Sequence, residues 1–142
     1  MIETVDVLET ELDDMTGEEI GYVTELLLEA GGLDVHTIPI YMKKNRPGIC
    51  IKIICHSDTT EKLKEIIFRE TTTLGIRMTR TIREVLDRDI KILNSSQGYV
   101  QVKQTKGEFQ KSKVEFEDLK RVSREKGIPL KEMKKRLEEE LQ

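Results

Sequence analysis

The chain has 142 residues, of which 37% are apolar and 36% charged, so it is polar for a compact domain but lies outside the disordered range. Tryptophan is absent, aromatic residues make up 4%, and the net charge is -3 with both signs interspersed. Proteins that bind single-stranded nucleic acid use aromatic platforms and basic grooves, so this composition argues against nucleic-acid binding. The charge balance also gives no drive toward an anionic membrane.

The sequence also favours a reducing, cytoplasmic location. No stretch is long enough to span a bilayer, and we recognise no basic-then-apolar leader. The two cysteines, Cys50 and Cys55, lie five positions apart in one apolar run. Strand alternation places them on opposite faces, which argues against a disulfide.

The first part of the chain predicts a ferredoxin-like βαββαβ fold of the α+β class with an antiparallel sheet. Pro39 cannot donate to a strand ladder, so the second strand is expected at a sheet edge. The predicted strands cover residues 2–12, 35–42, 49–55 and 75–85.

Two helices are expected between these strands. The first begins within residues 13–19, where capping oxygens precede acidic residues, and ends at Gly31-Gly32. The second is expected to be capped by Ser57 or Asp58. Helical spacing predicts the inward positions: Ile20, Val23, Leu27 and Ala30 in the first helix, and Leu63, Ile66 and Ile67 in the second.

The rest of the chain predicts a C-terminal β-hairpin and a helical extension. The hairpin pairs residues 90–93 with 99–104, turns at 95–98, and precedes a polar basic stretch, 103–113. One helix carries Phe116, Leu119 and Val122 and ends at Gly127; a second starts near Pro129 with Leu130, Met133, Leu137 and Leu141 on one stripe. We therefore expect a core domain, residues 1–88, with an extension, residues 89–142, packed with it.

The predicted topology brings three polar loops to one end of the sheet. The first strand, the second strand and the second helix all run toward that end. The loops that follow them are Asp13-Asp14, residues 43–48 and residues 70–77.

The side chains of these loops suit a metal–nucleoside triphosphate. Lys43, Lys44 and Arg46 form a cationic turn, and Arg69 and Arg77 flank the hydroxyls of Thr71, Thr72 and Thr73. Asp13 and Asp14 offer hard oxygen ligands for Mg²⁺ or Mn²⁺, which binds few carboxylates plus substrate phosphates.

Each of these features also has an ordinary structural interpretation. An Asp pair is often a helix cap, a cationic turn protects a sheet edge, and a run of threonines can begin a strand. There is no P-loop and no dinucleotide-binding fingerprint. His36 and His56 have no partner at ligand spacing, so both are expected to be structural or surface residues.

The same loops carry a family resemblance. Residues 9–16 (ETELDDMT), 42–48 (MKKNRPG) and 68–77 (FRETTTLGIR) resemble successive motifs of the LarC family, as do residues 113–118 (KVEFED) with Gly127 and Pro129 beyond them. That family comprises nickel insertases, or cyclometallases, which complete the nickel-pincer nucleotide cofactor of lactate racemase. The match spans nearly the whole chain and points to the family's C-terminal domain.

The resemblance implies a lyase-type, CTP-dependent reaction. Nickel, the inserted metal, enters pyridinium bisthiocarboxylic acid mononucleotide through nickel–sulfur and nickel–carbon bonds, and CTP is split at the α-phosphate. By resemblance Lys43, Lys44, Arg46, Arg69 and Arg77 hold the triphosphate. Thr71, Thr72 and Thr73 support the phosphate or the nucleotide, and Asp13 and Asp14 hold Mg²⁺ or Mn²⁺.

The resemblance also implies a partner. The family protein has a longer N-terminal portion, rich in histidines, which these residues do not match. We therefore expect this chain to be the CTP-binding half and to act together with an N-terminal LarC portion. No nickel ligand is assigned here.

A non-catalytic ligand-sensing or oligomerisation module is the alternative, because a ferredoxin-like fold does not fix function. The edge strand and the stripe of the last helix could both pack against other copies. We therefore expect a homo-oligomer, and a trimer-based assembly is one form that it could take. An RNA-binding sheet is the weakest interpretation, because the aromatic residues do not cluster on central strands.

Overall fold

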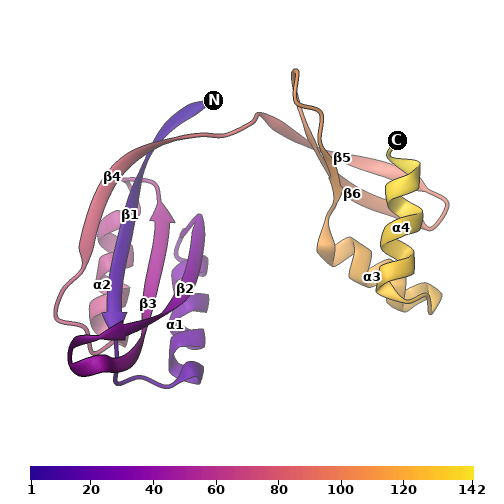
Figure 1. The fold of residues 1–142 in the computed structure, drawn as a ribbon. Coiled ribbons are helices and arrows are strands. Elements are labelled where there is room, and N and C mark those ends of the chain that lie inside the picture. The colour runs from indigo at the N-terminus through magenta and orange to yellow at the C-terminus, as the bar shows by residue number, and fades with distance from the viewer. The chain divides into compact units, whose positions relative to one another are not determined.

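A computed structural model describes residues 1–142 and divides them into two compact units. The first is Ile2–Glu84, and the second is Val85–Gln142 together with Met1. Figure 1 traces both units along the chain.

The first unit is a four-stranded antiparallel sheet with two helices, as the sequence predicts. The sheet order is β2-β3-β1-β4, which confirms the ferredoxin-like fold and the edge position of the proline-containing strand. The elements are β1 (Ile2–Leu12), α1 (Gly17–Glu29), β2 (Asp34–Met42), β3 (Arg46–Cys55), α2 (Thr60–Glu70) and β4 (Arg77–Glu84).

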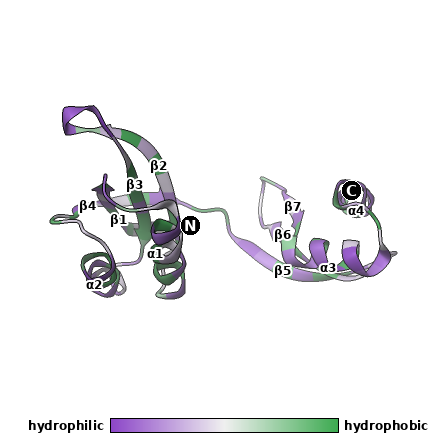
Figure 2. Cartoon of the chain, turned by 90° about the horizontal axis from the view of Figure 1, so that it is seen from below, coloured by the Kyte–Doolittle hydropathy of each residue, from purple (hydrophilic) through white to green (hydrophobic).

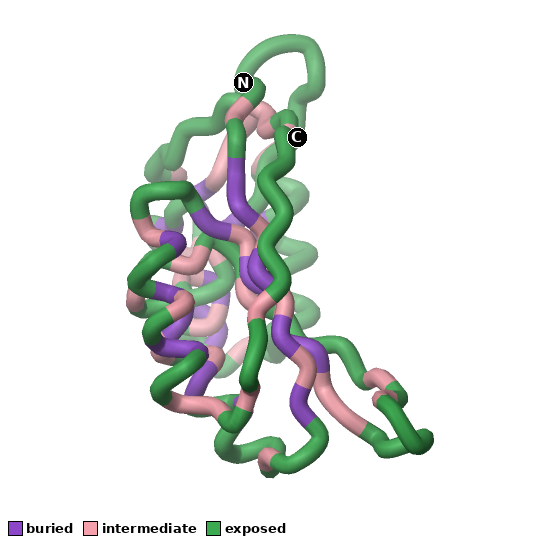
Figure 3. Tube along the Cα trace, turned by 90° about the vertical axis from the view of Figure 1, so that its left-hand side faces the viewer, coloured by how far each residue is buried: buried purple, intermediate pink, exposed green.

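Both helices cover the same face of this sheet, and the other face carries no helix (Figure 2). Alternation along β1 turns Leu8 and Leu12 toward the helices, whereas Glu9 and Glu11 lie on the open face. Figure 3 shows the buried positions gathered between helices and sheet. The core residues are Leu8, Leu12, Ile20, Val23, Leu27, Ile51, Ile53, Cys55, Leu63, Ile66 and Ile67.

The helix starts differ in detail from the sequence expectation. Thr16 caps α1: its hydroxyl accepts from the Glu19 amide, and the Glu19 carboxylate accepts from the Thr16 amide. This capping box leaves Asp13 and Asp14 in the preceding loop. The expectation that Ser57 or Asp58 caps α2 is wrong, because the N-cap position is Thr59 and it makes no side-chain capping bond.

The two cysteines are free, as expected. Cys55 belongs to the core beneath the helices, whereas Cys50 pairs in register with Glu11 and so lies on the open face. Burial raises the pKa of the Cys50 thiol, and the carboxylates of Glu9 and Glu11 raise it further.

The second unit is a three-stranded antiparallel sheet covered by two helices. The predicted hairpin is confirmed, with longer strands than expected. The third strand was not predicted: it lies at the end of the basic stretch and pairs with the second strand of the hairpin. The elements are β5 (Arg88–Ser95), β6 (Gly98–Thr105), β7 (Ser112–Val114), α3 (Phe116–Lys126) and α4 (Leu130–Glu140).

The two C-terminal helices pack on one face of this sheet. Gly127 ends α3 in the left-handed region, with φ of 64°, where a side chain would be strained. On the predicted stripe of α4, Met133 and Leu137 are buried, whereas Leu130 is partly exposed. The core residues are Val100, Val102, Val114, Leu119, Val122, Met133 and Leu137. None of the chain's helices combines the length and apolar character needed to cross a membrane.

Candidate functional site

The three predicted loops do meet at one end of the first sheet (Figure 1). An Arg46 guanidinium nitrogen lies 3.5 Å from an Asp13 carboxylate oxygen, which joins the β2–β3 turn to the loop after β1. The Thr72 hydroxyl donates to the Asp14 carboxylate at 2.5 Å, which joins the loop after α2 to the same segment. The predicted convergence is therefore confirmed by contacts.

The β2–β3 turn holds its cations in a defined backbone shape. Lys44 and Asn45 have φ of 59° and 58°, and the Arg46 amide donates to the Lys43 carbonyl. Two successive left-handed residues are closed by this bond into a tight turn, and residues 43–45 connect the paired Met42 and Arg46. Lysine is unusual in this conformation, where Gly, Asn or Asp is preferred.

Gly48 keeps this turn close to the end of β1. A Cβ atom at Gly48 would lie 2.7 Å from the Leu12 carbonyl oxygen and 2.7 Å from the Met42 sulfur. Leu12 immediately precedes Asp13, so the close approach holds the cationic turn beside the acidic loop. A side chain at this position would force the two segments apart.

The loop after α2 is organised by threonine hydroxyls. The Thr71 hydroxyl donates to the Ile67 carbonyl at 2.6 Å and so ends α2. Thr10, buried in β1, lies with its hydroxyl 2.6 Å from that of Thr73, which in turn is 2.9 Å from the Gly75 carbonyl oxygen. Thr72 is the exposed member, and its hydroxyl reaches the acidic loop.

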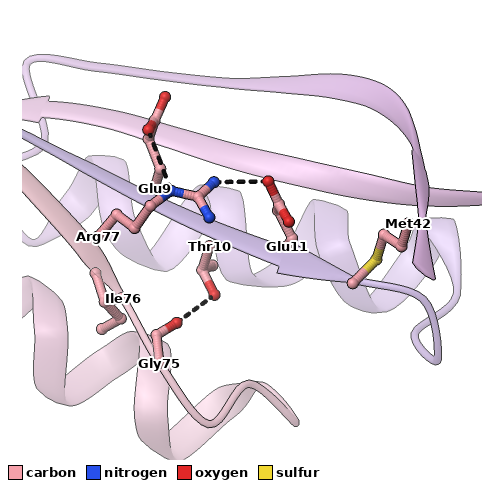
Figure 4. A pocket seen from close by; sticks show the side chains of 7 residues that line it. All are labelled: Glu9, Thr10, Glu11, Met42, Gly75, Ile76 and Arg77. Carbon is pink, nitrogen blue, oxygen red and sulfur yellow. Dashed lines mark hydrogen bonds and ion pairs between the residues drawn. The ribbon is translucent and has the colours of Figure 1, made fainter.

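A shallow hollow of about 320 Å³ lies beside these loops (Figure 4). Figure 4 shows the Arg77 guanidinium between Glu9 and Glu11, while Thr10 points the other way, toward Gly75. Arg77 lies 2.6 Å from Glu11 and 3.7 Å from Glu9. The Lys52 ammonium, 2.9 Å from Glu9, is the main cause that lowers the pKa of the Glu9 carboxyl; Arg77 adds to it.

Residue roles were not assigned to Glu9 and Glu11 from the sequence, although both line this hollow. Two signals could have found them. Period-two alternation places both on one face of β1, and antiparallel pairing of β1 with β4 sets Arg77 directly opposite Glu9.

The structure does not join all the expected cations to the loop cluster. Arg69 is exposed and pairs only with its neighbour Glu70, at 2.9 Å. Lys43 and Lys44 are exposed and make no ion pair, so their charges are available to a ligand. Arg77 is held on the open sheet face by two carboxylates.

A divalent cation at this loop cluster would take part of its coordination from the phosphates of a bound substrate. No three His, Cys, Asp or Glu side chains lie close enough to hold a metal ion by themselves. Asp13 and Asp14 fit the other common arrangement, in which one or two carboxylates and substrate phosphates share Mg²⁺ or Mn²⁺. His36 and His56 lie at 3.6 Å and 3.8 Å from Asp34 and Glu3, away from this loop cluster in sequence and pairing.

The fold and the loop cluster together define a ferredoxin-like α+β domain with cationic, acidic and hydroxyl side chains gathered at one end of its sheet. A family model described as "Nickel insertion protein" matches residues 1–134. The chain belongs to this nickel insertion protein family, which confirms the resemblance found in the sequence.

Two similar relatives are described as pyridinium-3,5-bisthiocarboxylic acid mononucleotide nickel insertion proteins. The one from Acetivibrio thermocellus is 49% identical over 87% of this chain and 31% of its own length. The one from Geobacillus kaustophilus is 44% identical over 83% of this chain and 29% of its own. The chain thus spans about 30% of the length of these relatives.

A solved structure covers almost the whole chain. It is LarC2, described as the C-terminal domain of a cyclometallase involved in the synthesis of the NPN cofactor of lactate racemase, in its apo form. It is 32% identical, covers 96% of both chains and has a TM-score of 0.91. A protein of Methanopyrus kandleri, 24% identical over 94% of this chain and 85% of its own with a TM-score of 0.63, shares the fold.

Proposed function

We propose that this chain is the CTP-binding part of an enzyme that inserts nickel into pyridinium bisthiocarboxylic acid mononucleotide. The metal–CTP site is the cluster formed by the Asp13-Asp14 loop, the β2–β3 turn and the loop after α2. The observation that carries the proposal is the contact of all three loops through Asp13 with Arg46 and Asp14 with Thr72.

The cations of the turn hold the triphosphate. Lys43 and Lys44 act as unpaired point charges, and Arg46 offers a planar fork for two phosphate oxygens. The Arg46–Asp13 pair is half-exposed, with 58% of the Arg46 side chain accessible, so it is weak enough to be exchanged for phosphate. Splitting CTP at the α-phosphate leaves charge on pyrophosphate, and these same groups stabilise that charge.

The remaining residues position the nucleotide and its ion. Asp13 and Asp14 supply carboxylate oxygens for Mg²⁺ or Mn²⁺, and the phosphates complete its coordination. The ion offsets phosphate charge when bound. Thr72 offers an exposed hydroxyl, while Thr71 and Thr73 keep the loop in shape. To contact the triphosphate, Arg77 needs to break its ion pair with Glu11 or with Glu9. Arg69 likewise needs to break its ion pair with Glu70.

Nickel insertion itself needs more than this chain. The relatives named for that activity are about three times as long, and the matched region here holds no three-residue metal cluster. We assign nickel the role of substrate and place its ligands in an N-terminal portion, which together with this chain forms the active enzyme. Binding of the cytosine base in particular rests on the family resemblance.

Calorimetric titration of CTP in the presence of Mn²⁺, with ATP as comparator, tests the proposal. We expect saturable binding that prefers CTP and is weakened at least about tenfold in Arg46→Ala, the loss of one charge-assisted contact. Lys62→Ala is the control, because Lys62 is an exposed α2 lysine without an ion pair. Equal binding by both variants, or no binding by the wild-type chain, contradicts the proposed site.

An oligomerisation module is the second candidate. The edge strand β2 exposes Tyr41 and part of Ile38, with 75% and 40% of each residue accessible, as a self-association surface would. Lys43→Ala combined with Arg46→Ala separates the two functions. If the double variant keeps nickel-inserting activity with the N-terminal portion but loses its oligomeric state in sedimentation, the module interpretation replaces CTP binding.

A further inference from the structure

The second unit carries a basic hollow that the proposed CTP site does not use. It measures about 180 Å³ and lies over the ends of β5, β6 and β7. The side chains that matter are cations and hydroxyls: Arg88, Lys103, Lys111, Lys113, Thr105 and Ser112.

Three of the four cations that line this hollow make no ion pair with an acid. Lys103 pairs with Glu115 at 2.8 Å, but Arg88, Lys111 and Lys113 make no ion pair. Lys113 also stands directly opposite Lys103 in the β6–β7 register. Like charges at directly opposed positions destabilise a sheet, so this arrangement has a cost that a bound anion would remove.

The loop that carries Lys111 is held in place. The Thr105 hydroxyl donates to the Phe109 carbonyl at 2.5 Å and accepts from the Lys111 amide at 2.7 Å. The Thr105 amide donates to the Lys111 carbonyl at 2.9 Å. The cation is therefore presented on an ordered backbone, which lowers the entropic cost of binding.

An apolar strip continues from the hollow along the same face of the sheet. Val100 and Val102 point into the core, so the alternate residues Tyr99 and Lys103 lie on the opposite face. Ile90 pairs with Lys103 in register, and Ile92 lies two residues along β5. Ile90, Ile92 and Tyr99 are 60%, 71% and 64% exposed, which is high for large apolar residues on one face.

We infer that this face is a second ligand site, which binds the phosphate monoester of a mononucleotide in the basic hollow and its ring on the apolar strip. A phosphate monoester carries close to two negative charges and three acceptor oxygens, which suits one arginine fork and two unpaired lysines. Ile90, opposite Lys103 in the β5–β6 register, and Ile92 beside it offer an apolar surface for the ring. The site gives the mononucleotide substrate a place separate from the triphosphate, and that assignment rests on the proposed function.

Nuclear magnetic resonance titration of the ¹⁵N-labelled chain tests the inference. The probes are nicotinic acid mononucleotide, which has a pyridinium ring and one phosphate, CMP, which has the phosphate with another base, and inorganic phosphate. The expected result is saturable shift changes at the amides of residues 103–113, with the mononucleotides binding more tightly than phosphate. Lys111→Gln and Lys113→Gln should each weaken this binding about tenfold. A matched control is Lys131→Gln, an exposed α4 lysine without an ion pair.

The Arg46→Ala variant separates this inference from the proposed CTP site. Retained mononucleotide binding in Arg46→Ala, together with its loss in Lys113→Gln, supports a second site even if CTP binding fails. Shift changes that disappear in Arg46→Ala but persist in both lysine variants overturn the inference. The absence of saturable changes at residues 103–113 also overturns it. Equal affinity for inorganic phosphate and for the mononucleotides overturns it as well, because the ring would then contribute nothing to binding.

Discussion

Asp6 is the buried charge of the first unit and lies near the middle of β1, away from the loop cluster that follows Leu12. Its carboxylate is inaccessible, accepts a hydrogen bond from the Thr60 hydroxyl at 2.7 Å and lies 2.8 Å from the Arg80 guanidinium. The hydrogen bond from Arg80, then that from Thr60, holds the pKa of Asp6 below its ordinary value, against the effect of burial. The carboxylate therefore stabilises the fold in its ionised form.

This lowered pKa predicts acid sensitivity of the first unit. Because the folded pKa lies below the unfolded value of about 3.9, the stabilisation is complete above that value and is lost as the pH falls through the folded pKa. Asp6→Asn removes the titration, so its unfolding free energy should depend less steeply on pH below about 4 than that of the wild type. Urea unfolding from pH 7 down to pH 3 measures the difference, because this interval runs from full stabilisation into the range where it is being lost.

Asp34→Asn is the control for this comparison, because Asp34 is exposed at a sheet edge beside His36. Parallel pH profiles for wild type and Asp6→Asn would show that Asp6 does not carry the stabilisation. The sequence did not predict this cluster: Asp6 shares a face of β1 with the core residues Leu8 and Leu12, but nothing local indicates that Thr60 and Arg80 face it.

The backbone conformation of Lys44 in the β2–β3 turn allows the residue's effect on stability to be measured apart from its effect on ligand binding. Lys44 has φ of 59°, in the left-handed region, where a Cβ atom costs about 1–2 kcal/mol. Gly or Asn would adopt this conformation at a lower free-energy cost, so the presence of lysine supports a role for its charge.

Lys44→Gly is therefore expected to raise the unfolding free energy by up to about 1 kcal/mol, after the entropic cost of glycine is subtracted. It should at the same time weaken Mn²⁺–CTP binding, since one cation is lost. Chemical denaturation and calorimetry on the same variant measure both effects.

The matched control is Lys43→Gly, at a neighbouring residue outside the left-handed region, which should lower stability by about 0.5–1 kcal/mol. Equal destabilisation by the two variants would contradict the strain assigned to Lys44.

Most elements could be predicted because their periodicity is strong. The spacing of Ile20, Val23 and Leu27 gave α1, and the apolar run from Ile49 to Cys55 gave β3. Strand β7 could not be predicted: it has three residues, two of them polar, and forms only because β6 offers a ladder partner. The cap of α2 was missed because the neighbouring Ser57 and Asp58 look equally suitable by composition.

At the scale of the whole chain, each unit has its own core. The first cluster draws only on Leu8 to Ile76, and the second only on Leu93 to Leu141. No core residue is shared, so neither cluster needs the other for burial of its apolar side chains. The expected core domain, residues 1–88, remains a prediction that this separation favours.

A chain ending at residue 88 should therefore fold by itself. We expect its circular dichroism spectrum to show helix and strand, and its thermal unfolding to be one cooperative transition. Cooperative burial around Leu8, Ile51 and Ile67 is the reason. An unfolded spectrum for this fragment would show that the second unit is needed for its stability.

The candidate site was predictable at this scale because topology alone sets where loops meet. In a βαββαβ sheet, the exits of β1, β2 and α2 share one end, and the contacts of Asp13 with Arg46 and Asp14 with Thr72 bear this out. The individual directions of Arg69 and Arg77 were not predictable, since they depend on which carboxylates lie within reach.

Paramagnetic broadening by Mn²⁺ tests the central claim most directly, because it locates the metal–nucleotide complex on the ¹⁵N-labelled chain. With Mn²⁺ and CTP together, the account predicts selective loss of the amide signals of residues 13–16, 43–46, 48 and 71–75, beyond the effect of Mn²⁺ alone. Broadening confined to residues outside these three loops, or no added effect of CTP, would contradict a metal–CTP site at this end of the sheet.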